Sequence, residues 1–599
     1  MKNFLVTTPI KDGYNKSEKN ILLGHWCLVD KKESKKKNNI INYHWADKKK
    51  FKKDAFYIKK TTEKIIKILS KKLNKIHNLK ENNNYWGLII YPWVFHYVSS
   101  IYDRWETIRI FLKSNRSKVY YTYQLEIKEN YLIPKNHNDF INNTFTDEWN
   151  HLIFLRIIKY LKPKKINLIK KNYRNSKIKN LEDKYGHPYS KKKNIFYYLI
   201  LIYEFIISKF AFKFNKIIFE SFSFPKKEFL KILIKNLLVP SLYSNLFKDI
   251  DLIEDLDFKN REKKLKVFER NSKSKDKFFN FLNESLINDL PTSYIENFSR
   301  IRKKMLVLAN KKKVIFSMRS WQYNDQFKIC MAELVKKRSK YFICDHGGGL
   351  VGEYTHIPNY INKFARHIRY DANIKQLKNQ KSFMLSPTIS TTNKKEIETK
   401  KNNRLNITFL EGVKYSNKHT PSAKAQEGIK QIEEIIKFID CLPQKIKKNT
   451  ILRSKKPYTL NIKEIFIEKF GKNKFNEHTD QNFYEFAKSS KLMIVNYPQT
   501  AFSESMYLNV PTILVCNKKF WFFKKKSLKM FELFKKNKMA FEDFKDAEKY
   551  IVKHWGEIYN WWHSKKIQEI RKLYLKNFFN VEKNWLYKWS KFIANQKKF

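Results

Sequence analysis

The sequence predicts an α/β protein with two Rossmann-like domains that face each other across a cleft. Two stretches carry this prediction. In residues 341–356, a short apolar run is followed by Asp345, His346 and three consecutive glycines, in a chain that has 12 glycines in 599 residues. Residues 491–515 have the pattern of a strand, a polar turn, a short helix and a second strand, which is typical of a βαβ unit.

The glycine-rich stretch places polar groups at the carboxyl end of a buried strand. In open α/β sheets ligands bind at this edge, and a glycine-rich turn exposes backbone N–H groups to an anion there. Gly347, Gly348 and Gly349 would let the backbone approach the phosphates of a ligand. His346 lies on the same edge, and Glu353 follows seven residues later. A tight turn with a hydrogen-bonded histidine is the structural alternative.

The second stretch predicts an anion site at a helix N-terminus. The polar turn 496–500 contains Gln499 and Thr500, and the helix that follows has Ser503 and Glu504 in its first turn. A helix N-terminus suits a phosphate or diphosphate, and Glu504 can accept hydrogen bonds from ribose or sugar hydroxyls. We therefore expect this turn and the glycine-rich loop to lie on one cleft.

Several segments resemble known transferases. The segments NYPQTAFSES and NVPTILV resemble the donor-binding segment of GT-B glycosyltransferases and of the capsule and teichoic-acid polymer transferases. FLVTTPI, ILLGHWC, WGLIIYPWVFHYVSSIYDRW, DEWNH and DHGGG, in this order, resemble a family of transferases encoded in O-antigen and other surface-polysaccharide loci. The resemblance covers about residues 1–580 and implies a GT-B-like fold with a nucleotide-activated donor.

Domain boundaries follow from composition. We expect an N-terminal α/β domain on the acceptor side at 1–391, with a helical insertion at about 194–312. The polar run 392–404 is predicted to be a linker, and 405–540 a C-terminal nucleotide-sugar-binding domain. Residues 541–599 are rich in tryptophan and are predicted to form a helical tail that packs back across the cleft.

Within these domains, hydrophobic periodicity predicts the individual elements. Expected strands are 4–7, 21–23, 119–126, 314–317, 341–344, 407–410, 450–453, 492–495 and 512–515. Expected helices are 48–79, 86–112, 148–161 with Asp147 as N-cap, one ending at Lys336, and 429–439. Residues 162–193 are expected to be a loop or insertion.

Three residues of the amino-terminal half are candidates for binding an acceptor. His25 follows a short strand and a glycine, although a capping histidine is the alternative. His96 and Arg104 lie on the aromatic segment 86–112, where aromatic faces could hold a sugar or could form core. Arg104 is expected either to be functional or to anchor a buried carboxylate.

Two arginines at strand ends are candidates for binding phosphate. Arg319 follows the strand 314–317 and could neutralise a phosphate. Arg453 ends the strand 450–453, and its place resembles the position where the polymer transferases hold the donor phosphate. The His-Pro that usually follows is replaced by Ser454 and Lys455 in this chain.

The net charge of +66 would ordinarily indicate nucleic acid. Here the excess is mostly lysine scattered along the chain, with abundant asparagine, isoleucine, phenylalanine and tyrosine, a profile that an AT-rich coding sequence produces. Zinc-finger, RNA-recognition and helix-turn-helix signatures are absent from the sequence, so nucleic acid is not an expected partner. A basic surface favours anionic lipid head groups and loose docking on the inner membrane.

The compartment is predicted from the cysteines and the amino terminus. The five cysteines are far apart and lack metal-ligand spacing, which indicates free thiols in a reducing cytoplasm. The start MKNFLVTTPI lacks the apolar core of a signal peptide. The most apolar run, 195–208, is shorter than a membrane span and contains Glu204, so it is predicted to be a buried helix.

Taken together, these observations predict a metal-independent glycosyltransferase of the GT-B type. It would move a sugar or alditol-phosphate unit from a nucleotide-activated donor to a lipid-linked or glycan acceptor of a surface polysaccharide. His346 would be the general base, because imidazole titrates near neutral pH, and Glu353 is the alternative base. The predicted donor-binding residues are Arg319, Gly347, Gly348, Gly349, Arg453, Gln499, Thr500, Ser503 and Glu504.

Two other functions remain open from the sequence. An epimerase or hydrolase that acts on a nucleotide-sugar would use the same fold without an acceptor. A non-enzymatic basic protein that binds membranes or nucleic acid would depend on its surface lysines rather than on His346 and Glu504. No essential metal ion is expected, because no DxD-like carboxylate pair stands at a convincing strand end. The nucleotide-sugar is expected as a substrate, without a further cofactor.

Overall fold

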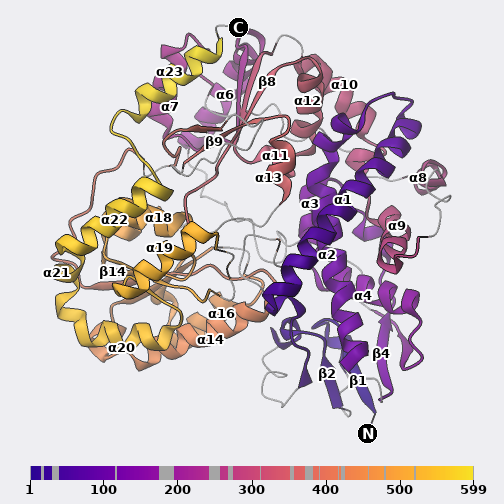
Figure 1. The fold of residues 1–599 in the computed structure, drawn as a ribbon, viewed down its shortest axis with the longest axis horizontal. Helices are drawn as coiled ribbons and strands as arrows, with labels where there is room; N and C mark the ends of the chain where they lie inside the picture. The colour runs from indigo at the N-terminus through magenta and orange to yellow at the C-terminus, as the bar shows by residue number, and fades with distance from the viewer. Residues whose placement is uncertain are drawn as a thin grey trace.

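The chain is a mixed α/β protein whose described part contains three separate parallel sheets (Figure 1). The structure is a computed structural model. It describes residues 2–14, 19–29, 39–114, 118–173, 195–241, 257–266, 274–309, 312–350, 356–370, 382–389, 392–415, 417, 419, 425–455, 458–477, 481–518, 521 and 523–597.

The first sheet has the strand order β3-β2-β1-β4-β5, with every strand parallel. Its strands are β1 (Asn3–Val6), β2 (Lys19–Leu22), β3 (Asn39–Ile40), β4 (Tyr120–Leu125) and β5 (Ile166–Lys171). The order reverses between β1 and β4, and such a switch point opens a crevice at the carboxyl ends of the two strands. Helices α3 (His137–Asn143) and α4 (Asp147–Leu161) lie between β4 and β5 in the chain.

Two long helices, α1 (Lys48–His77) and α2 (Asn83–Ser114), pack against each other and run along the right of Figure 1. The carboxylate of Asp47 accepts the backbone N–H groups of Lys49 and Lys50, which caps the start of α1. At a rise of 1.5 Å per residue, α2 is about 48 Å long. It also contacts α4 and α12, so most of its side chains are buried.

The second sheet has its five strands in chain order, β6 to β10. These are β6 (Ile217–Glu220), β7 (Val314–Ser317), β8 (Lys340–Cys344), β9 (Arg366–Arg369) and β10 (Ser382–Met384). Between β5 and β10 the chain also forms the helices α6 (Ile195–Phe214), α7 (Lys226–Lys235), α8 (Phe258–Leu265), α9 (Lys277–Asp289), α10 (Phe298–Ala309), α11 (Ser320–Tyr323), α12 (Asp325–Lys336) and α13 (His356–Ile361).

The second sheet is covered on both faces. Successive side chains of its strands belong in turn to the core on one face and to the core on the other. Ile315 and Ile343 belong to a large core that also contains the first sheet, α1, α2 and α12. Phe316 and Phe342, one residue away, belong to a separate core with α7 and the C-terminal helix. Successive side chains of a strand point to opposite faces, so the near-continuous apolar runs of β7 and β8 are those of strands buried on both sides.

The third sheet has the order β13-β12-β11-β14-β15-β16, the 3-2-1-4-5-6 order of nucleotide-binding Rossmann folds. Its strands are β11 (Arg404–Thr408), β12 (Thr450–Ser454), β13 (Phe475–Glu477), β14 (Ser490–Val495), β15 (Thr512–Val515) and β16 (Ala540–Phe541). Its helices are α14 (Ala425–Cys441), α15 (Gln444–Lys447), α16 (Ile462–Phe470), α17 (Phe483–Lys488), α18 (Thr500–Tyr507) and α19 (Lys525–Lys536).

The C-terminal segment crosses from the third sheet to the second. It consists of α20 (Phe544–His554), α21 (Ile558–His563), α22 (Lys565–Phe578) and α23 (Trp585–Lys597). Helix α22 packs against α18, whereas α23 packs against α7. Trp585, Trp589 and Ile593 of α23 complete the core that contains Phe316 and Phe342.

Most expected elements are present, but four expectations were wrong. The helical insertion predicted at 194–312 contains strand β6. The loop or insertion predicted at 162–193 contains strand β5, and its residues 174–193 lie outside the described residues. The described part of the amino-terminal half holds two sheets. Helix α4 is capped by the hydroxyl of Thr146, and Asp147 is its first residue. The run 195–208 belongs to α6, which is not a buried helix: Leu199 and Ile202 are more than half exposed.

Candidate functional site

The turn after β14 lies at the switch point of the third sheet, between β11 and β14. Asn496 ties the two strand ends together, because its side-chain oxygen accepts the backbone N–H of Leu410 at 2.8 Å. The turn continues through Pro498 to Gln499, the N-cap residue of α18, whose side chain makes no capping hydrogen bond. The first turn of α18 therefore keeps backbone N–H groups directed towards the switch point.

The glycine-rich loop after β8 is held in place by Asp345. Its carboxylate pairs with the His367 Nε2 atom at 2.8 Å and accepts the backbone N–H of Tyr370 at 3.2 Å. Although burial opposes it, the charge of His367 and its hydrogen bond lower the pKa of Asp345, so the carboxylate is ionised. This anchor fixes the direction in which the chain leaves β8.

The glycine-rich loop and the turn after β14 are in direct contact. The backbone N–H of Leu350 donates to the carbonyl of Pro498 at 2.9 Å. A Cβ atom on Gly347 would lie 2.0 Å from the Thr500 Oγ1 atom, and one on Gly349 would lie 2.5 Å from the Pro498 carbonyl oxygen. Gly349 also has a φ of +153°, which side chains disfavour.

The middle glycine of the loop, Gly348, lies against the C-terminal segment and α18. A Cβ atom on Gly348 would lie 2.3 Å from the ring of Phe579 and 2.9 Å from the Ser503 Oγ atom. The glycines thus allow the carboxyl edges of the second and third sheets to approach closely. This packing is a sufficient reason for them, in addition to the approach of a ligand.

Three basic side chains meet beside this contact. The Arg319 Nε atom donates to the His346 Nδ1 atom at 3.1 Å, and a second guanidinium nitrogen lies against the Nε2 atom. Lys455, at the end of β12, is close enough for its charge to act on His346. Arg319 and His346 come from the second sheet and Lys455 from the third, so the two edges form one positively charged site.

His346 is neutral in this arrangement. Its side chain is exposed to solvent, yet protein atoms crowd around it. This desolvation, followed by the positive charges of Arg319 and Lys455, lowers the pKa of His346 to about 3. The imidazole can accept a proton, but without an anion nearby it is a weaker base than an ordinary histidine.

The other predicted donor residues of the third sheet are more buried. Glu504 is 9% exposed. Burial, then the negative charge of Glu504, raises the pKa of Tyr497. Ser503 is fully buried and its hydroxyl bonds to the Tyr574 hydroxyl at 2.6 Å. Arg453 donates to the Asn476 side chain at 3.1 Å and to the Gln481 carbonyl at 2.7 Å. These contacts hold Arg453 towards β13.

Glu353, the alternative base, lies outside the described residues. Gln499 and Thr500 are half-buried at the start of α18, next to the glycine-rich loop. The structure therefore brings together His346, Arg319, the three glycines, Gln499, Thr500 and Ser503.

The predicted acceptor residue His25 lies elsewhere, at the carboxyl edge of the first sheet. Partial burial lowers its pKa, and its Nδ1 atom is buried without a hydrogen-bond partner among the described residues. A loop of the third sheet reaches the same edge: Lys414 and Tyr415 both bond to the carboxylate of Asp147 at the start of α4. The first sheet is thus in contact with the third at this second place.

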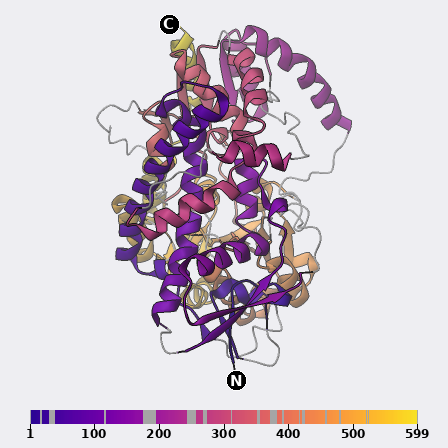
Figure 2. The same cartoon turned by 90° about the vertical axis from the view of Figure 1, so that its right-hand side faces the viewer.

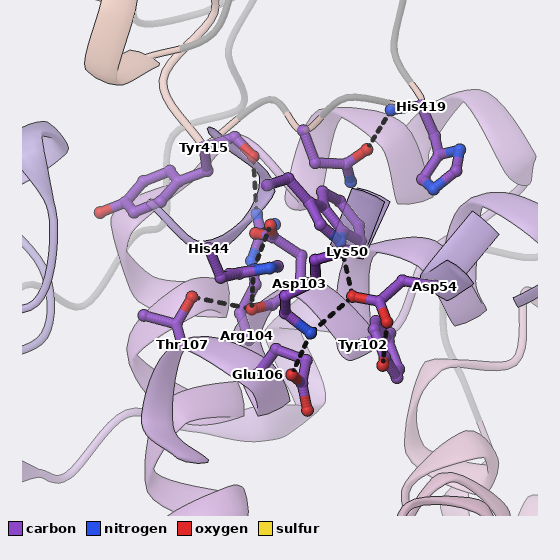
Figure 3. A network of polar contacts seen from close by, with 12 residues as sticks. His44, Lys50, Asp54, Tyr102, Asp103, Arg104, Glu106, Thr107, Tyr415 and His419 are labelled. Carbon is purple, nitrogen blue, oxygen red and sulfur yellow. Dashed lines mark hydrogen bonds and ion pairs between the residues drawn. The ribbon is translucent and has the colours of Figure 1, made fainter. Parts of the chain in front are cut away.

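Arg104 reinforces the contact between the first and third sheets (Figure 3). Its guanidinium is 2% exposed and donates to Asp103 at 2.8 Å, to Asn150 at 2.9 Å and to the carbonyl of Tyr415 at 2.9 Å. His44 also pairs with Asp103, at 3.2 Å. Arg104 therefore anchors a buried carboxylate, as one of the two sequence-based alternatives expected.

His96 lies in a buried polar network between α2 and α12. Its Nδ1 atom is 3.0 Å from the His137 Nε2 atom, and the His137 Nδ1 atom is 3.1 Å from the Lys328 Nζ atom. Lys328 in turn pairs with Asp325 at 2.7 Å. Burial, then the charge of Lys328, lowers the pKa of His96 to about 3. To bind an acceptor, His96 would have to give up its contact with His137 for a contact with the acceptor.

Sequence inspection missed three residues of the site. Lys455 carries the same signal as Arg453, because it is a basic residue at the end of the same strand, two positions later. Phe579 and Tyr574 carry no local signal, because they reach the site only through the path of the C-terminal segment. Their ring and hydroxyl contact Gly348 and Ser503, respectively.

Fold and site together define an α/β protein with a Rossmann-order sheet and a basic site at its switch point. Residues 3–593 match the model of the LIC12162 family of transferases, and the chain belongs to this family. No curated protein matches the chain. Within the described ranges, no helix has both the length and the apolar character to cross a membrane.

Proposed function

We propose that the protein is a GT-B-like glycosyltransferase that transfers a sugar or alditol-phosphate unit from a nucleotide-activated donor to a surface-polysaccharide acceptor. The observation that supports the proposal is a basic cluster at a Rossmann switch point. Arg319 contacts His346 within range of the charge of Lys455, and the glycine-rich loop beside them packs on Thr500 at the start of α18. Cationic side chains and helix N–H groups at such a point suit the phosphates of a nucleotide.

In the proposed reaction, an acceptor hydroxyl oxygen attacks the anomeric carbon of the sugar, or the phosphorus of an alditol-phosphate donor. A new bond forms to that oxygen, and the bond to the donor's leaving phosphate oxygen breaks. The acceptor proton passes to a base, and the nucleotide leaves with the electron pair. Arg319, Lys455 and the N–H groups of α18 would stabilise the negative charge that develops on the leaving group.

His346 remains the proposed base, with a condition. Burial, then the charges of Arg319 and Lys455, lowers the pKa of His346, and bound phosphates would offset the part that comes from the two charges. The base would then gain strength only when the donor is present. Glu504 is the proposed acceptor of hydrogen bonds from the ribose or sugar. The absence of a metal requirement stays a prediction.

The test is a thermal-shift titration of the full chain with UDP, GDP, CDP, CMP, dTDP and their common sugars. A ligand at about 100 times its dissociation constant stabilises the native state by about 2.7 kcal/mol. One nucleotide should raise the melting temperature of the wild type, and Lys455→Ala and Arg319→Ala should abolish the shift. Lys549→Ala, on the exposed side of α20, should keep it.

Three outcomes would count against the proposal. If no nucleotide stabilises the chain, the donor site is absent. If Lys455→Ala and Arg319→Ala leave the shift unchanged, the nucleotide binds elsewhere. If the protein converts or hydrolyses a nucleotide-sugar in the presence of acceptor without forming a glycan, it is an epimerase or hydrolase.

A further inference from the structure

Helix α6 (Ile195–Phe214) exposes an unusually large apolar surface. Figure 2 shows it at the upper right, extending away from the rest of the molecule. Its large apolar side chains that are at least 40% exposed are Tyr198, Leu199, Ile202, Tyr203, Phe205, Ile206, Phe210 and Phe214. A water-soluble surface rarely exposes so many adjacent apolar side chains without a binding role.

The buried side chains of α6 do not explain this apolar surface. Among the side chains of α6 that the structure describes, the buried ones are Glu204, Ser208 and Ala211, at helical spacing. The Glu204 Oε2 atom accepts a hydrogen bond from the Ser241 hydroxyl at 2.9 Å, so the carboxylate faces inwards. A surface helix of a globular protein normally buries its apolar face. Here folding alone does not explain the outward face.

Basic residues flank the apolar face. Lys213 and Lys216 follow at the end of the helix, and Lys235 lies at the end of α7; all three are exposed. The segment after α7 packs on α6, because the Asn215 side chain bonds to the backbone of Val239 in both directions. In that segment Leu237 is 93% exposed. The surface thus combines apolar side chains with nearby positive charge.

We propose that α6 lies in the interface of an anionic lipid bilayer, with its apolar face among the lipid chains and its lysines at the head groups. Helices with a broad apolar face and flanking lysines bind in this way, and anionic head groups attract the lysines. Tyr198 and Tyr203 suit the interface, where aromatic rings with a polar tip accumulate. The helix would lie along the membrane plane and would not cross it.

Charge favours a lipid surface over a second copy of the chain. Each chain carries a net charge of +66, so two copies brought together at α6 would repel each other. An anionic bilayer has the complementary charge. The inference does not depend on the proposed reaction, although a lipid-linked acceptor would be presented at such a surface.

The test is flotation of the full-length protein with vesicles. Vesicles of phosphatidylcholine with about 30% phosphatidylglycerol are compared with phosphatidylcholine alone, at about 0.15 M salt. The wild type should float with the anionic vesicles. Leu199→Ser/Ile202→Ser/Ile206→Ser should bind them at least about tenfold more weakly. Val307→Ser/Leu573→Ser/Tyr587→Ser removes exposed apolar side chains from other helices and should bind as the wild type does.

Two results would overturn the proposal. Equal binding of the α6 variant and the wild type would mean that lysines elsewhere hold the lipid. The face would belong to a second copy of the chain if three results held together. The wild type would not bind vesicles, it would sediment as a dimer, and the α6 variant would sediment as a monomer. If the α6 variant does not fold, hydrogen exchange on the wild type replaces it: slower exchange of α6 amides with vesicles supports the proposal, and unchanged exchange refutes it.

Discussion

Gly347, at the residue scale, shows how a missing side chain joins two sheets. We expect Gly347→Ala to lower the melting temperature, because its methyl group would lie 2.0 Å from the Thr500 Oγ1 atom. Thr500→Ala in the same chain should restore most of the loss, since the clashing hydroxyl is removed. Gly556→Ala is the control: nothing lies within 4 Å of its added Cβ atom. Thermal unfolding of the four proteins measures the effect, and a missing rescue would contradict the contact.

Gly349→Ala should behave differently from Gly347→Ala. Its methyl group would meet the backbone of Pro498, and its φ of +153° disfavours any side chain. We therefore expect no single side-chain substitution to rescue it. The sequence predicted that these glycines matter and where they lie. It could not show that the close neighbour is the chain itself, because a glycine signals close approach without identifying the approaching group.

His96 should make the protein less stable in mild acid. Its pKa is about 3 in the folded state and about 6.5 when unfolded, so below pH 6.5 the unfolded state binds the proton more tightly. Stability is lost as the pH falls from about 6.5 towards 3, by about 2 kcal/mol at pH 5 for this residue. His96→Gln should flatten the pH dependence of the urea midpoint between pH 5 and 6.5.

The control for this experiment is His554→Gln. It removes the imidazole at the end of α20 that pairs with Glu557. It should leave the slope contributed by His96 in place. Equal slopes for His96→Gln and the wild type would contradict the low pKa. The absolute stability of each variant is not the readout, because any change in the network with His137 alters it.

Arg104 should be among the most sensitive positions for stability. Arg104→Met would remove the guanidinium that pairs with the buried carboxylate of Asp103 and donates to the carbonyl of Tyr415. Breaking a buried pair in this way costs about 3–5 kcal/mol. Arg109→Met on the same helix breaks the ion pair with Glu106, in which the arginine side chain is half-exposed. It should cost less than about 1 kcal/mol. Denaturant unfolding of both variants decides; similar losses would contradict the burial argument.

At the scale of elements, short apolar runs bounded by polar turns were enough to predict strands β7, β8, β14 and β15. Strand β6 was missed because its sequence, IIFE, follows a long helical pattern without a break. Strand β5 was missed because its exposed lysines resemble a loop. Helix α6 was predicted to be buried because its sequence is strongly apolar. The sequence does not show which side of the helix faces the protein, and the tertiary contacts of Glu204 reveal that side.

Helix α23 should be essential to the second sheet. Trp589 is fully buried, and its indole nitrogen donates to the carbonyl of Ser386 at 2.9 Å. Trp589→Ala should cost about 3–5 kcal/mol through the cavity and the lost contacts. Tyr587→Ala, two residues away and 57% exposed, should stay within about 0.5 kcal/mol of the wild type. Comparable losses in thermal unfolding would show that α23 is not packed as described.

At the scale of the whole molecule, the third sheet contacts the other two at separate places. Its β14 turn meets the second sheet at the glycine-rich loop, and its β11 loop meets the first sheet at Asp147. The first contact could be expected from sequence, since both segments end strands at ligand-binding edges. The second could not, because Lys414 and Tyr415 carry no motif and find Asp147 only through the fold.

The path of α23 also bears on how the chain is made. A ribosome completes β7 and β8 before any of the third sheet exists, whereas Trp585 and Trp589, which cover Phe316 and Phe342, follow that sheet in the chain. Until they emerge, one face of the second sheet has no final cover. We expect nascent chains of this protein to depend on chaperones during synthesis, because exposed apolar strand surfaces aggregate.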